Sequence, residues 1–167
     1  MYSIGDRIVY GSSGIMEIVD IREERIGNVI RTYYVLRDVR ANVSSQTYVP
    51  TDNKKLVSTM RPLLTRDEIM DIISRIKTIP EALWHDDNRI RAEVFREVIE
   101  SADTEGMIAI IKAINENGIK RHEEGKKNFL ADESLMRKAE KMIYAEFSDV
   151  LGIPENEISD FIIKHLD

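Results

Sequence analysis

The side chains that could carry out chemistry are few and scattered along the chain. The three histidines, His85, His122 and His165, stand far apart and share no spacing typical of a metal site. The chain has no cysteine, which excludes thiolate ligands and cysteine nucleophiles. The stretch YGSSGI at residues 10–15 is one residue short of the G-x-S-x-G nucleophile motif and is more typical of a turn. The sequence therefore predicts no catalytic residues, metal or cofactor, and a binding protein is favoured over an enzyme.

One stretch, IPEALWHDDNRIRAE at residues 79–93, has a different character. It holds the only tryptophan, Trp84, followed by acids and then by Arg89 and Arg91. In one interpretation, Trp84 caps the helical core, because tryptophan is mostly buried, and the arginines pair with nearby acids. In the other, the indole projects toward nucleic acid, where stacking on a base is worth about 1–3 kcal/mol, and the arginines hold phosphates. Composition alone favours the first interpretation.

The charge distribution argues against an independent DNA-binding protein. The net charge is −6, with +1 in residues 1–59 and −7 in residues 60–167, so the basic surface typical of such proteins is missing. No apolar run approaches the roughly 18–20 residues of a membrane helix. The first residues lack the basic start and apolar stretch of a signal peptide. We expect a cytoplasmic protein with no membrane contact.

The pattern before residue 60 indicates a small antiparallel β-barrel or half-barrel. Short segments rich in β-branched and aromatic residues alternate with turn signals. The predicted strands are Arg7–Tyr10, Ile15–Ile21, Val29–Arg37 and Gln46–Pro50, with Leu56–Thr59 as a candidate closing strand. Such a sheet leaves an edge where a strand of another protein can pair.

After residue 60 the apolar period becomes helical, so the fold class is α+β, with a β domain at 1–59 and an all-α domain of about five helices at 60–167. Thr65 and Glu68 have capping-box spacing. The predicted helices lie at about 65–76, 88–101, 132–150 and 155–165, and a further one begins at Asp103 and ends near Gly118 or continues to His122. The inward stripe of the second is predicted to be Ile90, Val94, Phe95, Val98 and Ile99.

Five stretches follow one another along the chain in a specific order and spacing. YSIGDRIVYGSSGIMEIVDI opens it, and YYVLR and TYVP come next. LWHDDNRIRAEVFREVIESADTEGMIAIIKAI then contains the spacing W-x-x-x-x-R-x-R, and ADESLMRKAEKMIYAEFSDVLGI lies near the end. Together they resemble the bacterial CarD/CdnL family of RNA polymerase-binding transcription regulators over nearly the whole chain: its opening, its later strands, its W-x-x-x-x-R-x-R region with the helix pair after it, and its long late helix. The family's opening is shared with the polymerase-interaction module of transcription-repair coupling factor.

The resemblance implies a function. It implies a Tudor-like N-terminal module that binds the β-subunit lobe of RNA polymerase by sheet-edge pairing, and a monomer. The polymerase-binding residues would be Arg22, Arg25, Thr47, Tyr48 and Val49. The helical domain would reach promoter DNA near the −10 element, where Trp84 wedges into the minor groove at the upstream edge of the bubble and stabilises the open complex. The other DNA-contacting residues would be Arg89, Arg91, Lys126 and Lys127.

Two alternatives remain open at this point. Asp86 and Asp87 lie shortly after Trp84, where some relatives have arginines, and the helical half is acidic. The chain could therefore be an adaptor of the same fold that binds polymerase with little or no DNA contact. An enzyme whose site a single sequence hides is the other alternative, and no set of residues suggests a substrate for it.

Overall fold

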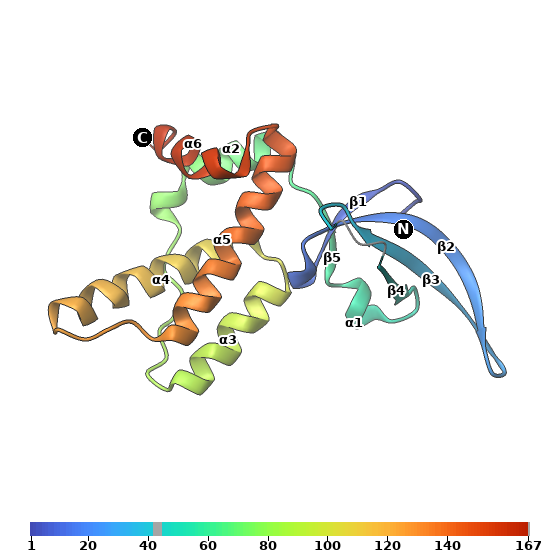
Figure 1. Ribbon diagram of the computed structural model, residues 1–167, viewed down its shortest axis with the longest axis horizontal. Helices are drawn as coiled ribbons and strands as arrows, with labels where there is room; N and C mark the ends of the chain where they lie inside the picture. The colour runs from blue at the N-terminus through green and yellow to red at the C-terminus, as the bar shows by residue number, and fades with distance from the viewer. Residues whose placement is uncertain (42–44, 167) are drawn as a thin grey trace. The chain divides into compact units, whose positions relative to one another are not determined.

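A computed structural model describes residues 1–41 and 45–166, which form two compact units, Met1–Leu63 and Leu64–Asp167 (Figure 1). The first unit is an antiparallel sheet and the second is helical, so the predicted α+β class is confirmed. The unit boundary lies four residues later than the predicted domain boundary. Residues 60–63 group with the sheet because Met60–Pro62 forms a strand, β5, that pairs with the first strand.

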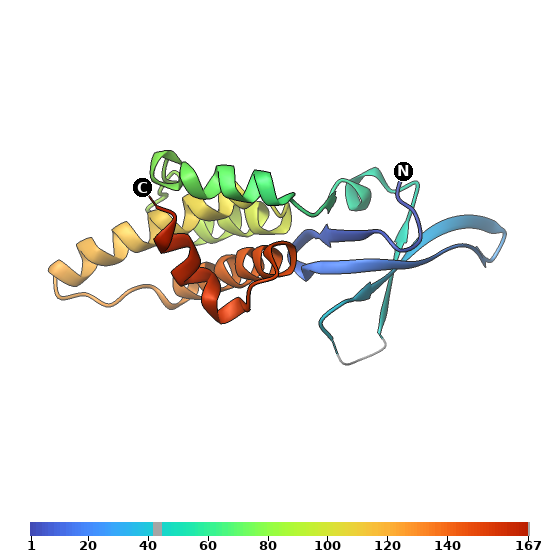
Figure 2. The ribbon, with the colours of Figure 1, turned by 90° about the horizontal axis from the view of Figure 1, so that it is seen from above.

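The first unit is a five-stranded sheet in the order β4-β3-β2-β1-β5. Its other strands are β1 (Arg7–Tyr10), β2 (Ile15–Ile26), β3 (Val29–Asp38) and β4 (Gln46–Pro50). β2 and β3 form a long curved hairpin (Figure 2). Its two-residue turn places Gly27 at a φ of 64°, which a side chain would disfavour and which a turn of this length requires at its first central position.

Alternation of apolar residues along these strands builds one core. Ile8 from β1, Ile18 from β2 and Leu36 from β3 are almost completely buried together with Val49 from β4. The Tyr2 hydroxyl donates a hydrogen bond to the Met60 carbonyl oxygen at 2.9 Å and so joins the N-terminal residues to β5. Val9 and Val35, on the opposite face of β1 and β3, are buried as well, so both faces of the sheet are covered at these positions.

The prediction that Leu56–Thr59 closes the sheet is wrong. Lys54–Val57 is a short helix, α1, and the closing strand is β5. Asn53 begins α1, since its side-chain oxygen accepts a hydrogen bond from the Leu56 N–H at 3.2 Å. An Asn at this position caps a helix turn efficiently, and this local preference outweighs the β-branched character of Val57.

Within residues 64–166, the second unit contains five α-helices around one core. Their bounds are α2 (Arg66–Ser74), α3 (Asn88–Glu100), α4 (Thr104–Glu123), α5 (Leu130–Leu151) and α6 (Ile158–Lys164), with 3-10 turns η2 (Ile76–Thr78) and η3 (Glu155–Glu157). A further 3-10 turn, η1 (Gly11–Ser13), lies between β1 and β2 of the first unit. The predicted capping box at Thr65 and Glu68 is present.

Helix α3 has Phe95 and Ile99 in the core and Val94 and Val98 packed against it, as predicted, but the predicted inward position of Ile90 is wrong. Ile90, predicted to face inward, is 49% exposed, whereas Arg91 is 1% exposed. The buried residues of α3 are Arg91, Phe95 and Ile99, which follow one another at four-residue spacing on one face. An arginine therefore occupies the first core position of this helix.

An ion pair joins the end of α2 to the start of α4 and gives a prediction on pH dependence. Arg75 donates from both terminal nitrogens to the carboxylate of Glu105, and this pairing lowers the pKa of Glu105. Because the folded-state pKa is lowered, the pair stabilises the fold above the ordinary carboxyl pKa of about 4.3, and this contribution is lost as the pH falls through the lowered value. We expect Glu105→Gln to reduce the free energy of unfolding at pH 7 and to matter progressively less at lower pH.

Urea unfolding of the wild type and Glu105→Gln between pH 3 and 7 measures this difference. The matched control is Glu97→Gln, at an exposed position of α3. A Glu105→Gln deficit that stays constant over the whole pH range would contradict the assignment to the ion pair.

Candidate functional site

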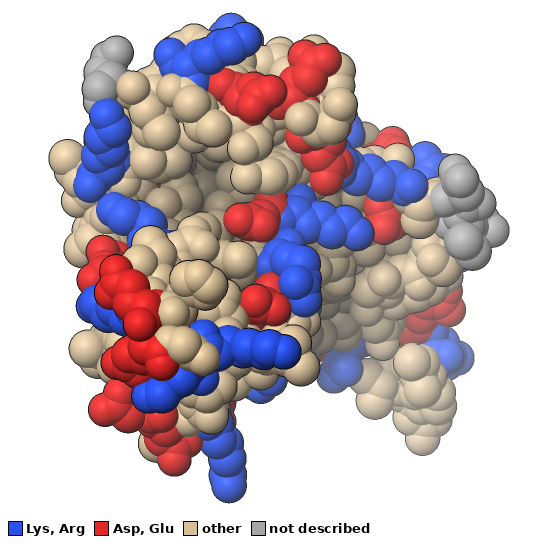
Figure 3. Space-filling view, turned by 60° about the vertical axis from the view of Figure 1, so that its left-hand side comes forward, with Lys and Arg blue, Asp and Glu red and all other residues tan. Residues whose placement is uncertain are grey.

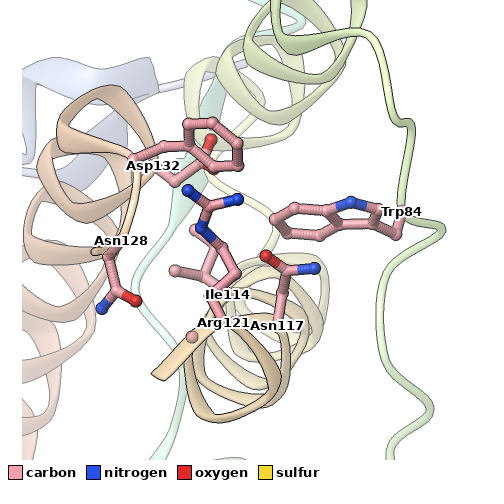
Figure 4. A pocket seen from close by; sticks show the side chains of 8 residues that line it. Trp84, Ile114, Asn117, Arg121, Asn128 and Asp132 are labelled. Atoms are coloured by element: carbon pink, nitrogen blue, oxygen red, sulfur yellow. The ribbon is translucent and has the colours of Figure 1, made fainter. Parts of the chain in front are cut away.

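Trp84 lies in the extended segment between η2 and α3, and it is neither a core residue nor a freely projecting one. The segment is tied to α4 by the Ala82 N–H, which donates to the Ala109 carbonyl oxygen at 3.0 Å. The indole is half-buried and meets the ring of Phe95 edge-on, with the ring centroids 6.3 Å apart. The indole also borders a narrow recess, too small for a water molecule, that Asn117 and Arg121 line as well (Figure 4).

Arg91 is at the centre of a buried polar network beside this indole. Its Nη2 and Nε donate to the two carboxylate oxygens of Asp132, at 2.8 and 3.2 Å. Nη1 donates to the His85 carbonyl oxygen at 2.6 Å, and Nη2 also donates to the side chain of Asn88 at 2.8 Å. Both members of the ion pair are almost completely buried. The prediction that Arg91 holds a DNA phosphate is corrected, because its guanidinium is out of reach of solvent and already paired.

Arg89, two residues earlier, is exposed, because positions two apart on a helix point to nearly opposite sides. It follows the N-cap of α3. Asp87 accepts hydrogen bonds from the Arg89 and Ile90 N–H groups at 2.8 and 2.9 Å. Asp87 thus has the helix-start role that an acid favours at the positive end of a helix.

The two predicted lysines lie in the loop between α4 and α5, and both are exposed. Lys126 pairs with Glu124 at 2.6 Å. The Lys127 carbonyl oxygen accepts a hydrogen bond from Arg121 Nε at 2.9 Å. Arg121, in the last turn of α4, was not predicted. It lies over the Phe129 ring at 3.9 Å and borders the recess beside Trp84. The sequence signal that could have identified Arg121 is its place at the end of α4, just before a loop that contains Phe129.

Acidic side chains also lie beside the tryptophan. A second recess, of about 150 Å³, is lined by Trp84 together with Glu81, Glu116 and Lys120. A hydrogen bond with Glu116 raises the pKa of Glu81, and the hydrogen bonds with Glu81 and Lys120 lower the pKa of Glu116. On the face drawn in Figure 3, basic and acidic side chains are interspersed. The indole is therefore not set in a uniformly positive surface.

The predicted polymerase-binding strand β4 is an edge strand, since it pairs with β3 and stands at the end of the sheet order. The Thr51 N–H donates to the Thr32 carbonyl oxygen at 2.9 Å. By the alternation of an antiparallel ladder, Thr47 and Val49 then bond toward β3, whereas the backbone groups of Tyr48 point outward. The side chain of Val49 is fully buried, so it can serve a partner only through the strand that it anchors.

The other predicted polymerase-binding residues lie on β2. Arg22 lies over the ring of Tyr48, with 5.0 Å to the centroid, and forms ion pairs with Glu24 at 3.2 Å and with Asp20 at 3.7 Å. Arg25 is exposed near the hairpin turn, where it is the register partner of Ile30. The hairpin end also exposes large apolar side chains that were not predicted as a surface: Ile26, Val29 and Ile30, at 57–68% exposure. Arg22 and Tyr48 therefore form one contiguous surface, and Arg25 lies farther along the hairpin.

No group of three or more His, Asp or Glu side chains in residues 1–41 and 45–166 is arranged to hold a metal ion. None of the helices in the described part of the chain is long and apolar enough to cross a membrane.

Comparison with known proteins identifies the domain family of the first unit. Residues 2–64 match the family model of the CarD-like/TRCF RID domain. Comparison of the chain with curated proteins gave no significant match. The matched residues coincide with almost the whole of the β unit, including the edge strand β4 and the closing strand β5. The N-terminal unit of this protein is a CarD-like RNA polymerase-interacting module.

Proposed function

We propose that this protein is a polymerase-tethered transcription regulator that stabilises the promoter open complex through Trp84. The observation that carries the proposal is the joining, in one chain, of a polymerase-interacting module to a helical unit with a partly exposed indole. The module would bind the β-subunit lobe through the outward groups of β4. Trp84 would then contact the minor groove at the upstream edge of the bubble, near the −10 element.

Binding to polymerase would allow an acidic protein to contact DNA. An acidic protein has weak intrinsic attraction for DNA, because phosphate neutralisation supplies most non-specific affinity. A second contact made by a protein already bound to polymerase is intramolecular, with an effective concentration of about the millimolar range. Weak DNA contacts then suffice. A bent or partly melted promoter segment is recognised by shape, so base-reading side chains are not required.

The polymerase contact gives a prediction that separates backbone pairing from side-chain recognition. Tyr48→Pro removes an outward N–H without removing a bond to β3, since this N–H points away from the ladder. In the variant, the carbonyl oxygen of a polymerase strand that pairs with the Tyr48 N–H would have no donor. We therefore expect the affinity for polymerase to weaken about 5-fold or more. Tyr48→Ala keeps the donor and removes only the side chain.

Titration of both variants against the purified polymerase β lobe tests the pairing, with circular dichroism as the folding control. Weaker binding by Tyr48→Pro than by Tyr48→Ala is expected. Equal binding of Tyr48→Pro and the wild type would show that β4 does not pair with the polymerase.

The DNA contact gives a prediction on salt dependence. Of the predicted DNA-contacting cations, Arg89, Lys126 and Lys127 are exposed. Each phosphate contact contributes about 0.9 to the slope of log affinity against log salt. We expect their combined replacement by Gln to lower that slope for promoter retention on polymerase, with no change in polymerase binding. The charge-matched control replaces Lys138, Lys141 and Lys164, which are exposed on α5 and α6.

A second candidate function is an adaptor that binds polymerase without contacting DNA. The acidic surroundings of Trp84, made up of Glu81, Asp86, Asp87 and Glu116, favour it. The same salt titration distinguishes the two functions. Promoter retention that is identical with the wild type, the triple variant and no added protein would favour the adaptor.

A further inference from the structure

Trp84 stands at one end of a series of stacked aromatic and cationic side chains. The Arg91 guanidinium carbon lies 4.1 Å from the centroid of the Trp84 ring and 5.0 Å from that of Phe129. On Phe129, Arg121 follows at 3.9 Å. These side chains come from the segment before α3, from α3, from the residue before α5 and from α4. Each ring therefore packs against a guanidinium group that comes from another element than the ring itself.

Arg91 itself has almost no freedom to move. A guanidinium has five N–H donors in a rigid fork, and the four hydrogen bonds to Asp132, His85 and Asn88 occupy most of them. Asp132 lies in the first turn of α5, where the helix end favours a negative charge. The guanidinium plane is thus fixed by two helices and by the segment that carries Trp84.

A buried ion pair is a poor source of stability, because apolar residues of similar volume often replace it at no cost. What this pair does provide is geometry. It sets the position of a planar cation against one face of the indole, and it fixes the carbonyl group of His85, the residue after Trp84. The indole also lines the second recess, which has a volume of about 150 Å³.

We infer that the Arg91–Asp132 pair is a positioning device that holds the Trp84 indole in the orientation that contacts DNA, an inference that rests on the proposed function. Arg91 touches no DNA itself. Ordering one side chain on binding lowers affinity by about 2- to 12-fold. An indole that must first be ordered should therefore shorten the open-complex lifetime by about that factor relative to a preorganised one.

The test variant is the double substitution Arg91→Met/Asp132→Leu, which removes both charges and keeps an apolar side chain at each position. A second variant, Arg91→Lys, keeps a charge for Asp132 but loses the planar group over the indole. Arg96→Met, at an exposed position of α3, is the control. Three quantities are compared: acrylamide quenching of the single tryptophan, binding to polymerase, and the lifetime of the open complex, with Trp84→Ala measured in parallel.

We expect both test variants to bind polymerase normally, to show a more accessible and more mobile indole, and to shorten the open-complex lifetime by about 2- to 12-fold. If Trp84→Ala shortens the lifetime while both test variants keep the wild-type lifetime, the positioning role is overturned and the proposed function stands. If Trp84→Ala has no effect, the proposed function is overturned and this inference with it. If the double variant does not fold, Arg91→Lys decides between the same outcomes.

Discussion

Asp132→Ala is expected to lower the free energy of unfolding of the helical unit by about 3–5 kcal/mol, because it leaves the buried charge of Arg91 without its partner. The carboxylate accepts two hydrogen bonds from the guanidinium, and both side chains are hidden from water. The bonds to the His85 carbonyl oxygen and to Asn88 remain, but neither carries a compensating charge. The cost is therefore much larger than for an exposed ion pair.

Urea unfolding at pH 7, followed by circular dichroism, measures this cost. Ser134→Ala, at an exposed position two residues later in α5, is the matched control and should be close to the wild type. Asp132→Asn keeps an acceptor in place and should fall between Ala and the wild type. A loss below about 1 kcal/mol for Asp132→Ala would mean that Arg91 reaches water or another partner, and the rigid placement of the guanidinium would be refuted.

Trp84→Ala is expected to remove the effect on the open complex entirely while leaving polymerase binding intact. The indole is the only large aromatic surface that the segment before α3 offers, and the polymerase-interacting module occupies residues 2–64. Truncation of a fully buried tryptophan lowers the free energy of unfolding by about 3–5 kcal/mol. The loss should be smaller here, since the indole is only half-buried. The substitution removes the edge-on packing against Phe95 and the stacking of the indole on Arg91.

Leu83→Ala is the control for this prediction, because Leu83 is the neighbouring apolar residue and is 74% exposed. It removes apolar surface from the same segment without touching the indole. Trp84→Phe should retain part of the effect, since a smaller ring still presents an apolar face. A Leu83→Ala variant as defective as Trp84→Ala would assign the effect to the segment as a whole.

Helix α3 shows where prediction from the sequence is limited. Arg89 and Arg91 both follow Trp84 and are predicted to share one role, yet they lie on nearly opposite sides of the helix. The signal is present in the sequence, because Arg91 precedes Phe95 and Ile99 at four-residue spacing. The predicted hydrophobic stripe nevertheless begins at Ile90, since an arginine is rarely buried without a partner. That partner, Asp132, is 41 residues away and only the tertiary structure identifies it.

The β unit is more accessible to prediction. Short runs of β-branched and aromatic residues next to turn signals locate β1 and β4 at their observed bounds, and the Pro at residue 50 is compatible with the edge position of β4. The closing strand is misplaced because Lys54–Val57 is short, and its helical turn depends on a single cap at Asn53. A helix of four residues is too short to show a helical period of apolar residues in the sequence. The pairing of β5 with β1 is a contact between segments about 50 residues apart, which sequence patterns do not specify.

The most direct test is promoter melting by purified cognate polymerase holoenzyme with a fluorescent base in the bubble. It compares no addition, the wild type and Trp84→Ala, with polymerase binding of both proteins measured in the same samples. A longer lifetime of the melted state with the wild type, and the lifetime of polymerase alone with a Trp84→Ala variant that still binds, is the predicted result. If both proteins bind polymerase and neither changes melting, the open-complex function is contradicted and the adaptor function takes its place.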